Sequence, residues 1–140
     1  MSTSSKVNII FVMIFGGIFL VSLYKKRVVE IDLIKEKFEV TSGNIISFKK
    51  RLPKNIIPPK YNYSIKSKIY KGGFVSQKIC KELNVSEAAE LKRVNFPVVY
   101  SVNKREVSRM LIRPKDFKEF GLSFPDSLQS IYVKYFKDCE

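Results

Sequence analysis

The stretch "YNYSIKSKIY", residues 61–70, gives the strongest indication of the fold. Aromatic and β-branched side chains occupy alternate positions in it: Tyr61, Tyr63, Ile65 and Ile69. Polar residues separate them, and a period of two is typical of a strand with one buried face. The pattern fits one long strand that ends at Gly72-Gly73, or two strands that turn near residues 66–68. Both interpretations predict that the tyrosines and isoleucines share a buried face while the lysines are exposed.

Residues downstream of this stretch predict a helix and two further strands. "KELNVSEAAELKRV" (81–94) contains the two alanines of the chain and predicts a short helix with Ser86 as its N-cap. The aromatic and β-branched segments "NFPVVYSVN" (95–103) and "VSRMLIRP" (107–114) each predict a strand.

The C-terminal segments predict short helices and one last strand. "PKDFKEFG" (114–121) fits one or two helical turns, with Pro114 first and Gly121 at the C-cap. "FPDSLQS" (124–130) predicts a turn or short helix, and "IYVKYFK" (131–137) predicts a final strand.

The segments upstream of residue 61 are less regular. Residues 28–40 fit a half-buried strand and a helical stripe equally well. "TSGN" (41–44) is expected to end either element, "IISFKKR" (45–51) to form a short strand, and "LPKNIIPPK" (52–60) to form a loop. The predicted fold class is α+β: an N-terminal transmembrane helix, then a small, mostly antiparallel β-domain with one or two short helices.

A hydrophobic run precedes the domain. Residues 7–24, "VNIIFVMIFGGIFLVSLY", are eighteen residues without a charge, of which twelve are Ile, Leu, Val or Phe. As a helix they would be about 27 Å long, close to the thickness of the hydrocarbon core of a bilayer. We therefore expect a transmembrane helix that anchors the chain.

The flanks of residues 7–24 favour a retained anchor with the domain on the cytoplasmic side. A cleavable signal peptide would need a basic n-region and an A-x-A-like site, and neither is present. One basic side chain, Lys6, precedes the run, and five follow it: Lys25, Lys26, Arg27, Lys35 and Lys37. By the positive-inside rule, this bias favours a cytoplasmic domain at a bacterial inner or plasma membrane.

The net charge of +13 is concentrated in one segment. Residues 40–81 contain ten Lys or Arg and no acidic residue, whereas residues 82–140 contain ten basic and nine acidic residues. Anionic lipid headgroups are the first expected partner; nucleic acid, an acidic membrane protein and mere compositional bias are the alternatives. Candidates for contact with an anionic surface are Lys49, Lys50, Arg51, Lys54, Lys60, Lys66, Lys68 and Lys71.

Residue types needed for common catalytic and metal sites are missing. The chain has no histidine, which excludes Ser-His and Cys-His pairs and His-based metal sites. Cys80 and Cys139 are too few for a structural zinc site, although they could form a disulfide in an exported domain. Asp116 and Glu119 alternate with lysines on what the sequence predicts to be a solvated turn. We expect no catalytic residue, cofactor or metal, and no enzyme.

Aromatic residues interleaved with lysines offer a second functional interpretation. The aromatic residues Tyr61, Tyr63, Tyr70 and Phe74 are interleaved with or follow the lysines of residues 60–71, and such a combination suits stacking of single-stranded bases. The isoleucines on the tyrosines' predicted face favour burial of that face instead.

The segment "FPVVYSVNKREVSRMLI" (96–112) carries a family resemblance. It consists of a hydrophobic run ending in Tyr100, a polar turn at residues 103–106, and an apolar strand from Ser108. With the anchor, the glycine-bearing strand and the polar hairpin, it resembles a group of uncharacterised bacterial membrane-anchored proteins with a small β-domain. The resemblance covers residues 40–113; it implies the fold and no activity.

The sequence thus predicts four regions: a polar tail (1–6), a transmembrane helix (7–24), a juxtamembrane segment (25–39) and a β-rich domain (40–140) whose basic part is 40–81. The expected function is that of a non-enzymatic interaction or accessory module at the membrane surface. The alternatives are a membrane-tethered nucleic-acid-binding module and an exported-side domain with a Cys80–Cys139 disulfide.

Overall fold

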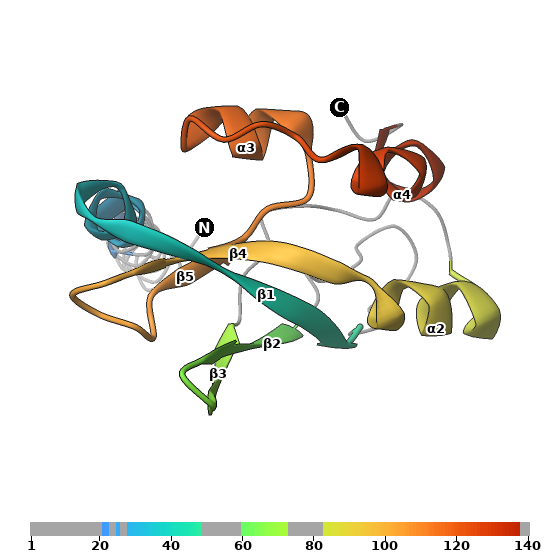
Figure 1. The fold of residues 1–140 in the computed structure, drawn as a ribbon, viewed down its shortest axis with the longest axis horizontal. Helices are drawn as coiled ribbons and strands as arrows, with labels where there is room; N and C mark the ends of the chain where they lie inside the picture. Colours follow the sequence, from blue (N-terminus) through green and yellow to red (C-terminus); the bar gives the residue numbers. More distant parts are fainter. Residues whose placement is uncertain (1–20, 23–24, 26–27, 49–59, 73–82, 138–140) are drawn as a thin grey trace, which may run out of the picture.

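A curved antiparallel sheet is the centre of the fold. The computed structural model describes residues 21–22, 25, 28–48, 60–72 and 83–137. In this part of the chain, five strands form a half-barrel in the order β3-β2-β1-β4-β5 (Figure 1). The predicted α+β class with an antiparallel sheet is confirmed. The strands are β1 (Phe38–Ser47), β2 (Lys60–Ile65), β3 (Lys68–Gly72), β4 (Asn95–Ser101) and β5 (Ser108–Met110).

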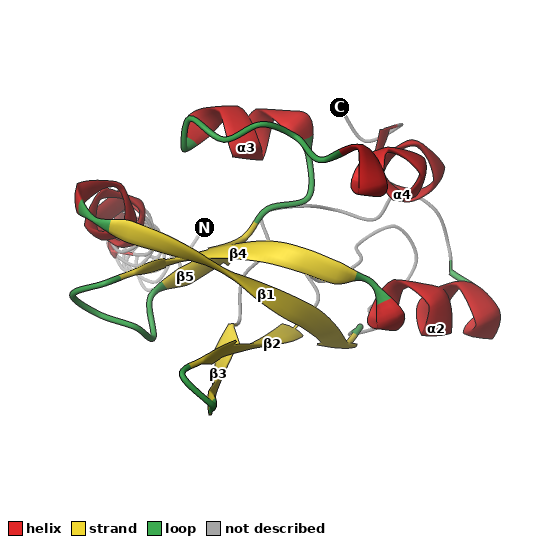
Figure 2. Ribbon diagram, in the orientation of Figure 1, coloured by secondary structure: helices red, strands yellow, loops and turns green. Residues whose placement is uncertain are grey.

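Four short helices follow the hairpin in the described part of the chain. They are α2 (Val85–Arg93), α3 (Pro114–Glu119), the 3-10 helix η1 (Asp126–Leu128) and α4 (Gln129–Tyr135). Figure 2 shows α3 and α4 together on one side of the sheet, with α2 beyond one end of β1 and β4. The rings of Phe38 in β1 and Phe120 after α3 meet edge to face at 5.5 Å, which joins α3 to this side of the sheet.

A helix leads directly into the sheet. Residues 28–36 are helical, as are 21, 22 and 25, and β1 begins at Phe38. Of the two patterns that residues 28–40 fit, the helical one therefore holds to residue 36. Ile34 in this helix is 2% exposed and belongs to the hydrophobic core of the domain.

The predicted transmembrane segment is only marginally covered by the structure. No helix in the described ranges is long and apolar enough to cross a bilayer. Of residues 7–24, the structure describes only 21 and 22, so this prediction lies almost wholly outside the described residues.

Strand β1 continues through residues 41–44, where the sequence predicted a break. A Cβ atom on Gly43 would lie 2.6 Å from Val98 Cγ2 and 2.8 Å from the Asn62 carbonyl oxygen. Glycine is therefore needed here because β1 lies between β2 and β4 and a side chain would collide with both. The sequence predicted a strand that begins at residue 45. That start is wrong, because residues 45–47 are the end of β1, which begins at Phe38.

The opening stretch is a hairpin of two strands, as one of the two interpretations predicted. Residues 66 and 67 form the turn with φ of 47° and 68°, both left-handed. Tyr61, Tyr63 and Ile65 are buried as expected. The prediction for Ile69 is wrong: after the turn it pairs with Ser64, faces the other side, and is 68% exposed.

The helix and strands that follow the hairpin agree with the sequence except in detail. Helix α2 begins one residue after its N-cap Asn84, which forms a capping box with Glu87, so the predicted cap Ser86 lies inside the helix. Strand β4 matches its prediction, while β5 is limited to three residues.

The C-terminal helices correct the last predicted strand. Pro114 begins α3, and Gly121 follows it with φ of 66°, as predicted. Residues 131–137 were predicted as a strand, but α4 occupies most of them. The buried positions from the last residue of η1 to the residue after α4 follow a helical spacing of four, seven and eight residues, which places them on one face. They are Leu128, Tyr132, Tyr135 and Phe136.

Candidate functional site

The hairpin of β2 and β3 carries half of the predicted anionic-surface residues. Its lysines, Lys60, Lys66, Lys68 and Lys71, are all exposed. Residues 60–72 contain no carboxylate, and none of the four lysines is paired with a carboxylate of the described residues. We call these strands, with the four lysines, the basic hairpin. The other four candidates, Lys49, Lys50, Arg51 and Lys54, lie outside the described residues.

Strand register divides the basic hairpin into two faces. Tyr61 pairs with Gly72 and Tyr63 with Tyr70, so these residues share the inner face of the half-barrel. On the outer face, Ser64 pairs with Ile69, and Lys71 lies two residues further along β3. The outer face therefore presents an exposed isoleucine beside an exposed lysine at an edge of the sheet.

Tyrosine rings fill the inner face. The ring of Tyr63 stacks on those of Tyr70 and Tyr100, with centroid distances of 5.6 and 6.4 Å. The hydroxyl of Tyr63 donates to the Arg105 carbonyl oxygen at 2.6 Å. These rings are thus committed to packing: Tyr63 and Tyr100 are buried and Tyr70 is half-buried.

Tyr61 of β2 contacts β5, which is not its neighbour in the sheet. Its hydroxyl lies 3.0 Å from Ser108 Oγ of β5, and burial raises its pKa to about 12. Gly72 lies against the ring, where an added Cβ would be 2.0 Å from Tyr61 Cζ. Gly72, where one interpretation of the sequence ended a long strand, is therefore required by close packing against a ring.

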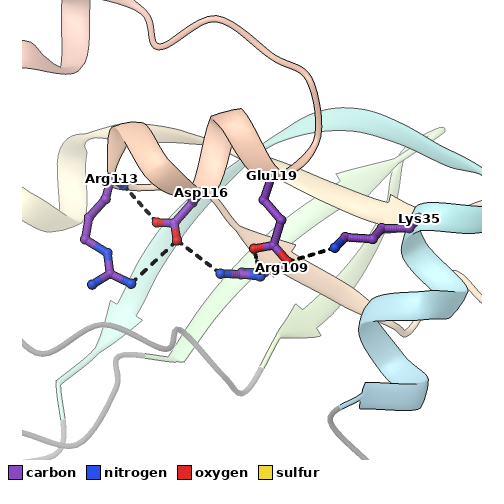
Figure 3. A network of polar contacts seen from close by, with 5 residues as sticks. All are labelled: Lys35, Arg109, Arg113, Asp116 and Glu119. Atoms are coloured by element: carbon purple, nitrogen blue, oxygen red, sulfur yellow. Dashed lines mark hydrogen bonds and ion pairs between the residues drawn. The ribbon is translucent and has the colours of Figure 1, made fainter.

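A network of charged groups, shown in Figure 3, lies on the side of the sheet that α3 covers. Asp116 accepts from Arg109 Nη2 at 3.0 Å and from the Arg113 backbone N–H at 2.9 Å. Glu119 accepts from Arg109 Nη1 at 2.7 Å and pairs with Lys35 Nζ at 3.1 Å. The network thus connects β5, α3 and the helix of residues 28–36.

The prediction that Asp116 and Glu119 lie on a solvated turn is wrong for Asp116. Asp116 is 1% exposed, because it caps α3 and faces two guanidinium groups. Burial raises the pKa of Glu119, but the hydrogen bond from Lys35 and the charge of Arg109 outweigh it, so that pKa is lowered. Both carboxylates are held by cations and stabilise the domain. A sequence signal exists in hindsight: an acidic residue at the third position of a proline-initiated helix is a typical capping residue.

A second polar cluster joins α2 to α4. Glu90 accepts from Lys134 Nζ at 2.7 Å and from the Tyr135 hydroxyl at 2.5 Å. Burial, and then the hydrogen bond to Glu90, raise the pKa of Tyr135. Beside this cluster is a cavity of about 530 Å³ lined by Ser86, Ala89, Glu90, Arg93, Val94 and Ile131. No group of three potential metal ligands occurs within the described ranges.

Comparison with known proteins gives no match: no protein-family model, no curated protein and no solved structure is similar to this chain. Functional inference therefore depends on the chain's own geometry, in which the basic hairpin is the largest unpaired group of charges described above.

Proposed function

We propose that the protein is a single-pass membrane protein whose domain is a non-enzymatic interaction or accessory module, and that the basic hairpin contacts anionic lipid headgroups. The observation that carries the proposal is the presence of four exposed lysines and no carboxylate on thirteen residues that include β3, the edge strand of the sheet in the described part of the chain. A basic side chain near an anionic surface contributes about 1 kcal/mol, so four together can hold the hairpin there.

The short connection to the proposed anchor supports this assignment. Phe38, the first residue of β1, lies fourteen positions after Tyr24, the last residue of the predicted span. At 1.5 Å per residue, a helix covers that separation in roughly 20 Å. The burial of Ile34 and the pairing of Lys35 with Glu119 attach this helix to the domain. The domain would therefore be held within reach of the headgroups.

The packing of the tyrosines favours lipid over nucleic acid as the anionic partner. A surface that stacks single-stranded bases needs exposed aromatic faces. Tyr61 and Tyr63 are at most 2% exposed, and the ring of Tyr70 is stacked on Tyr63. What the hairpin presents is a set of lysines and one isoleucine.

Hydrogen exchange of the full-length protein in lipid nanodiscs would test the proposal. We expect the amides of residues 60–72 to exchange several-fold more slowly in nanodiscs with anionic lipid than in purely zwitterionic ones. Replacing all four lysines of the basic hairpin with Gln should abolish the difference. Equal exchange in the two lipids would contradict the proposal.

A matched variant controls for the change in total charge. In this variant, four exposed lysines outside the hairpin are replaced with Gln, which removes the same total charge. They are Lys92, Lys115, Lys118 and Lys137. We expect this variant to keep the lipid-dependent protection. Loss of protection in both variants would mean that net charge, and not the basic hairpin, determines the contact.

The side of the membrane is tested separately. We propose the cytoplasmic side, on the basis of the Lys and Arg bias around residues 7–24. A membrane-impermeant maleimide should label Cys80 and Cys139 only after cell lysis. Labelling in intact cells, above all after reduction, would place the domain outside and favour the disulfide-containing alternative.

A further inference from the structure

Ile69 is a large apolar side chain exposed within a basic surface. It is 68% exposed on edge strand β3, while its neighbours on the same hairpin pack inward. Lys68 precedes it, Lys71 lies on the same face two residues later, and its cross-strand partner is Ser64. A branched aliphatic in such a position gains free energy only by leaving water.

The turn beside Ile69 retains side chains where small residues would be favoured. Both central residues, Lys66 and Ser67, have left-handed φ, and Asn-Gly is the sequence that such a two-residue turn prefers. Side chains in this conformation are strained, and strain of this kind is concentrated at functional positions. The strained residue at the tip is also a lysine, so the turn adds a charge next to the isoleucine.

We infer that Ile69 inserts into the headgroup–acyl boundary of the anionic bilayer that holds the chain, while Lys71 on the same face and Lys66 at the turn bind phosphates beside it; Lys68, which pairs with Ile65, lies on the opposite face with its ammonium over the Tyr70 ring. This inference rests on the proposed function and adds to it an apolar insertion. An aliphatic side chain beside lysines is the combination by which interfacial segments bind anionic bilayers. Lys66 and Lys71 can each keep the ammonium at the phosphates while the methylenes lie along the apolar boundary.

The same lysines argue against a protein strand as the occupant of this edge. Lysines on an edge strand oppose the addition of another strand. Pairing with a second copy would bring two hairpins of four lysines each together, with no carboxylate on either. An anionic lipid surface neutralises these charges and also accepts the isoleucine.

Tryptophan fluorescence offers a direct test because the chain contains no tryptophan. In the full-length Ile69→Trp variant, the only indole would report the environment of position 69. We expect its emission to shift to the blue in anionic nanodiscs and to be quenched several-fold by lipids brominated near the headgroup. The matched control is Val85→Trp, at the first residue of α2, where Val85 is 89% exposed. Its emission should remain that of indole in water.

The outcome separates the inference from the proposed function. An indole at position 69 that stays unquenched in anionic nanodiscs overturns the insertion, while lysine-dependent protection of residues 60–72 would leave the headgroup contact standing. Quenching of both indoles to the same extent also overturns it, since the contact would then not be specific to the hairpin.

Two further variants distinguish a loss of insertion from misfolding of the hairpin. Ser67→Gly relieves strain at the turn and leaves all four lysines, so we expect full quenching of the indole at position 69 in that background. Ile69→Ser keeps the charges and lacks the apolar group. We expect its lipid-dependent protection to disappear at high salt, where the unmodified chain retains a part. Equal salt sensitivity of the two chains overturns the inference.

Discussion

Asp116→Asn is the substitution that most directly tests how the domain is held together. It removes the negative charge that lies between Arg109 and Arg113, whose side chains are 15% and 13% exposed. Removal of one partner from a buried ion pair costs about 3–5 kcal/mol, because the other charge stays buried without compensation. Arg109 keeps its bond to Glu119 at 2.7 Å, so we expect the lower end, about 3 kcal/mol.

Thermal and denaturant-induced unfolding, followed by circular dichroism on the full chain, would measure this loss. At roughly 4–5 °C per kcal/mol for a domain of this size, Tm should fall by roughly 12–15 °C. Asp116→Ala should cost about 1 kcal/mol more, because it also removes the cap that accepts from the Arg113 N–H.

The control is Asp126→Asn, in the exposed first turn of η1. A surface change of this kind should alter stability by no more than about 0.5 kcal/mol. A loss below about 1 kcal/mol for Asp116→Asn would contradict a stabilising role for this ion pair, since removing a buried carboxylate from between two cations should cost more.

Four further substitutions, two of them combined with a pH titration, test the packing and the electrostatics. Gly72→Ala should destabilise the domain by about 3 kcal/mol, the upper part of the range for overpacked cores, because the new methyl group overlaps the ring of Tyr61. Gly121→Ala meets open space and should cost only about 1 kcal/mol from its left-handed φ. Absorbance titration should show that Tyr61 ionises near pH 12 in the folded protein. The free energy of unfolding should decrease from about pH 10 upward, because the phenol ionises there in the unfolded chain but not in the folded one. Tyr61→Phe should make this decrease with pH less steep. The pKa of Glu119 is lowered in the folded state, so its contribution to the free energy of unfolding is present above about pH 4.3 and is lost as the pH falls through the folded pKa. Glu119→Gln should therefore reduce the loss of stability at acid pH, as measured by unfolding at a series of pH values.

The parts of the fold that could be predicted depend on neighbouring residues along the chain. The alternation of Tyr61, Tyr63 and Ile65 indicates a buried strand face, and Pro114 and Gly121 mark the ends of a short helix. These signals are local, and the structure agrees with them.

The parts that could not be predicted depend on residues far apart in the sequence. Gly43 reads as a strand breaker, yet it is required inside β1 because Val98 and Asn62 leave no space for a side chain. Residues 131–137 are rich in β-branched and aromatic residues, but their contacts with the core follow a helical spacing. Asp116 reads as solvated because its partner Arg109 lies on a different element.

The candidate site likewise has one feature that the sequence predicts and one that it does not. The exposed lysines of the hairpin could be predicted from the alternating pattern. The exposure of Ile69 could not, because it depends on the turn at residues 66–67, which transfers the following residue to the opposite face. One residue of register decides whether that isoleucine lies in the core or in solvent.

The order of strands also has a consequence for synthesis. The hairpin pairs residues at most eleven apart, whereas Phe38 in the central strand pairs with Ser101, and Lys35 with Glu119. We expect the hairpin to form early and the β1–β4 pairing to form late, since long loops must close first. At 5–20 residues per second, roughly 3–13 s pass between the synthesis of Phe38 and that of Ser101. During this interval one edge of β1 has no partner, and the nascent chain is most open to aggregation and proteolysis.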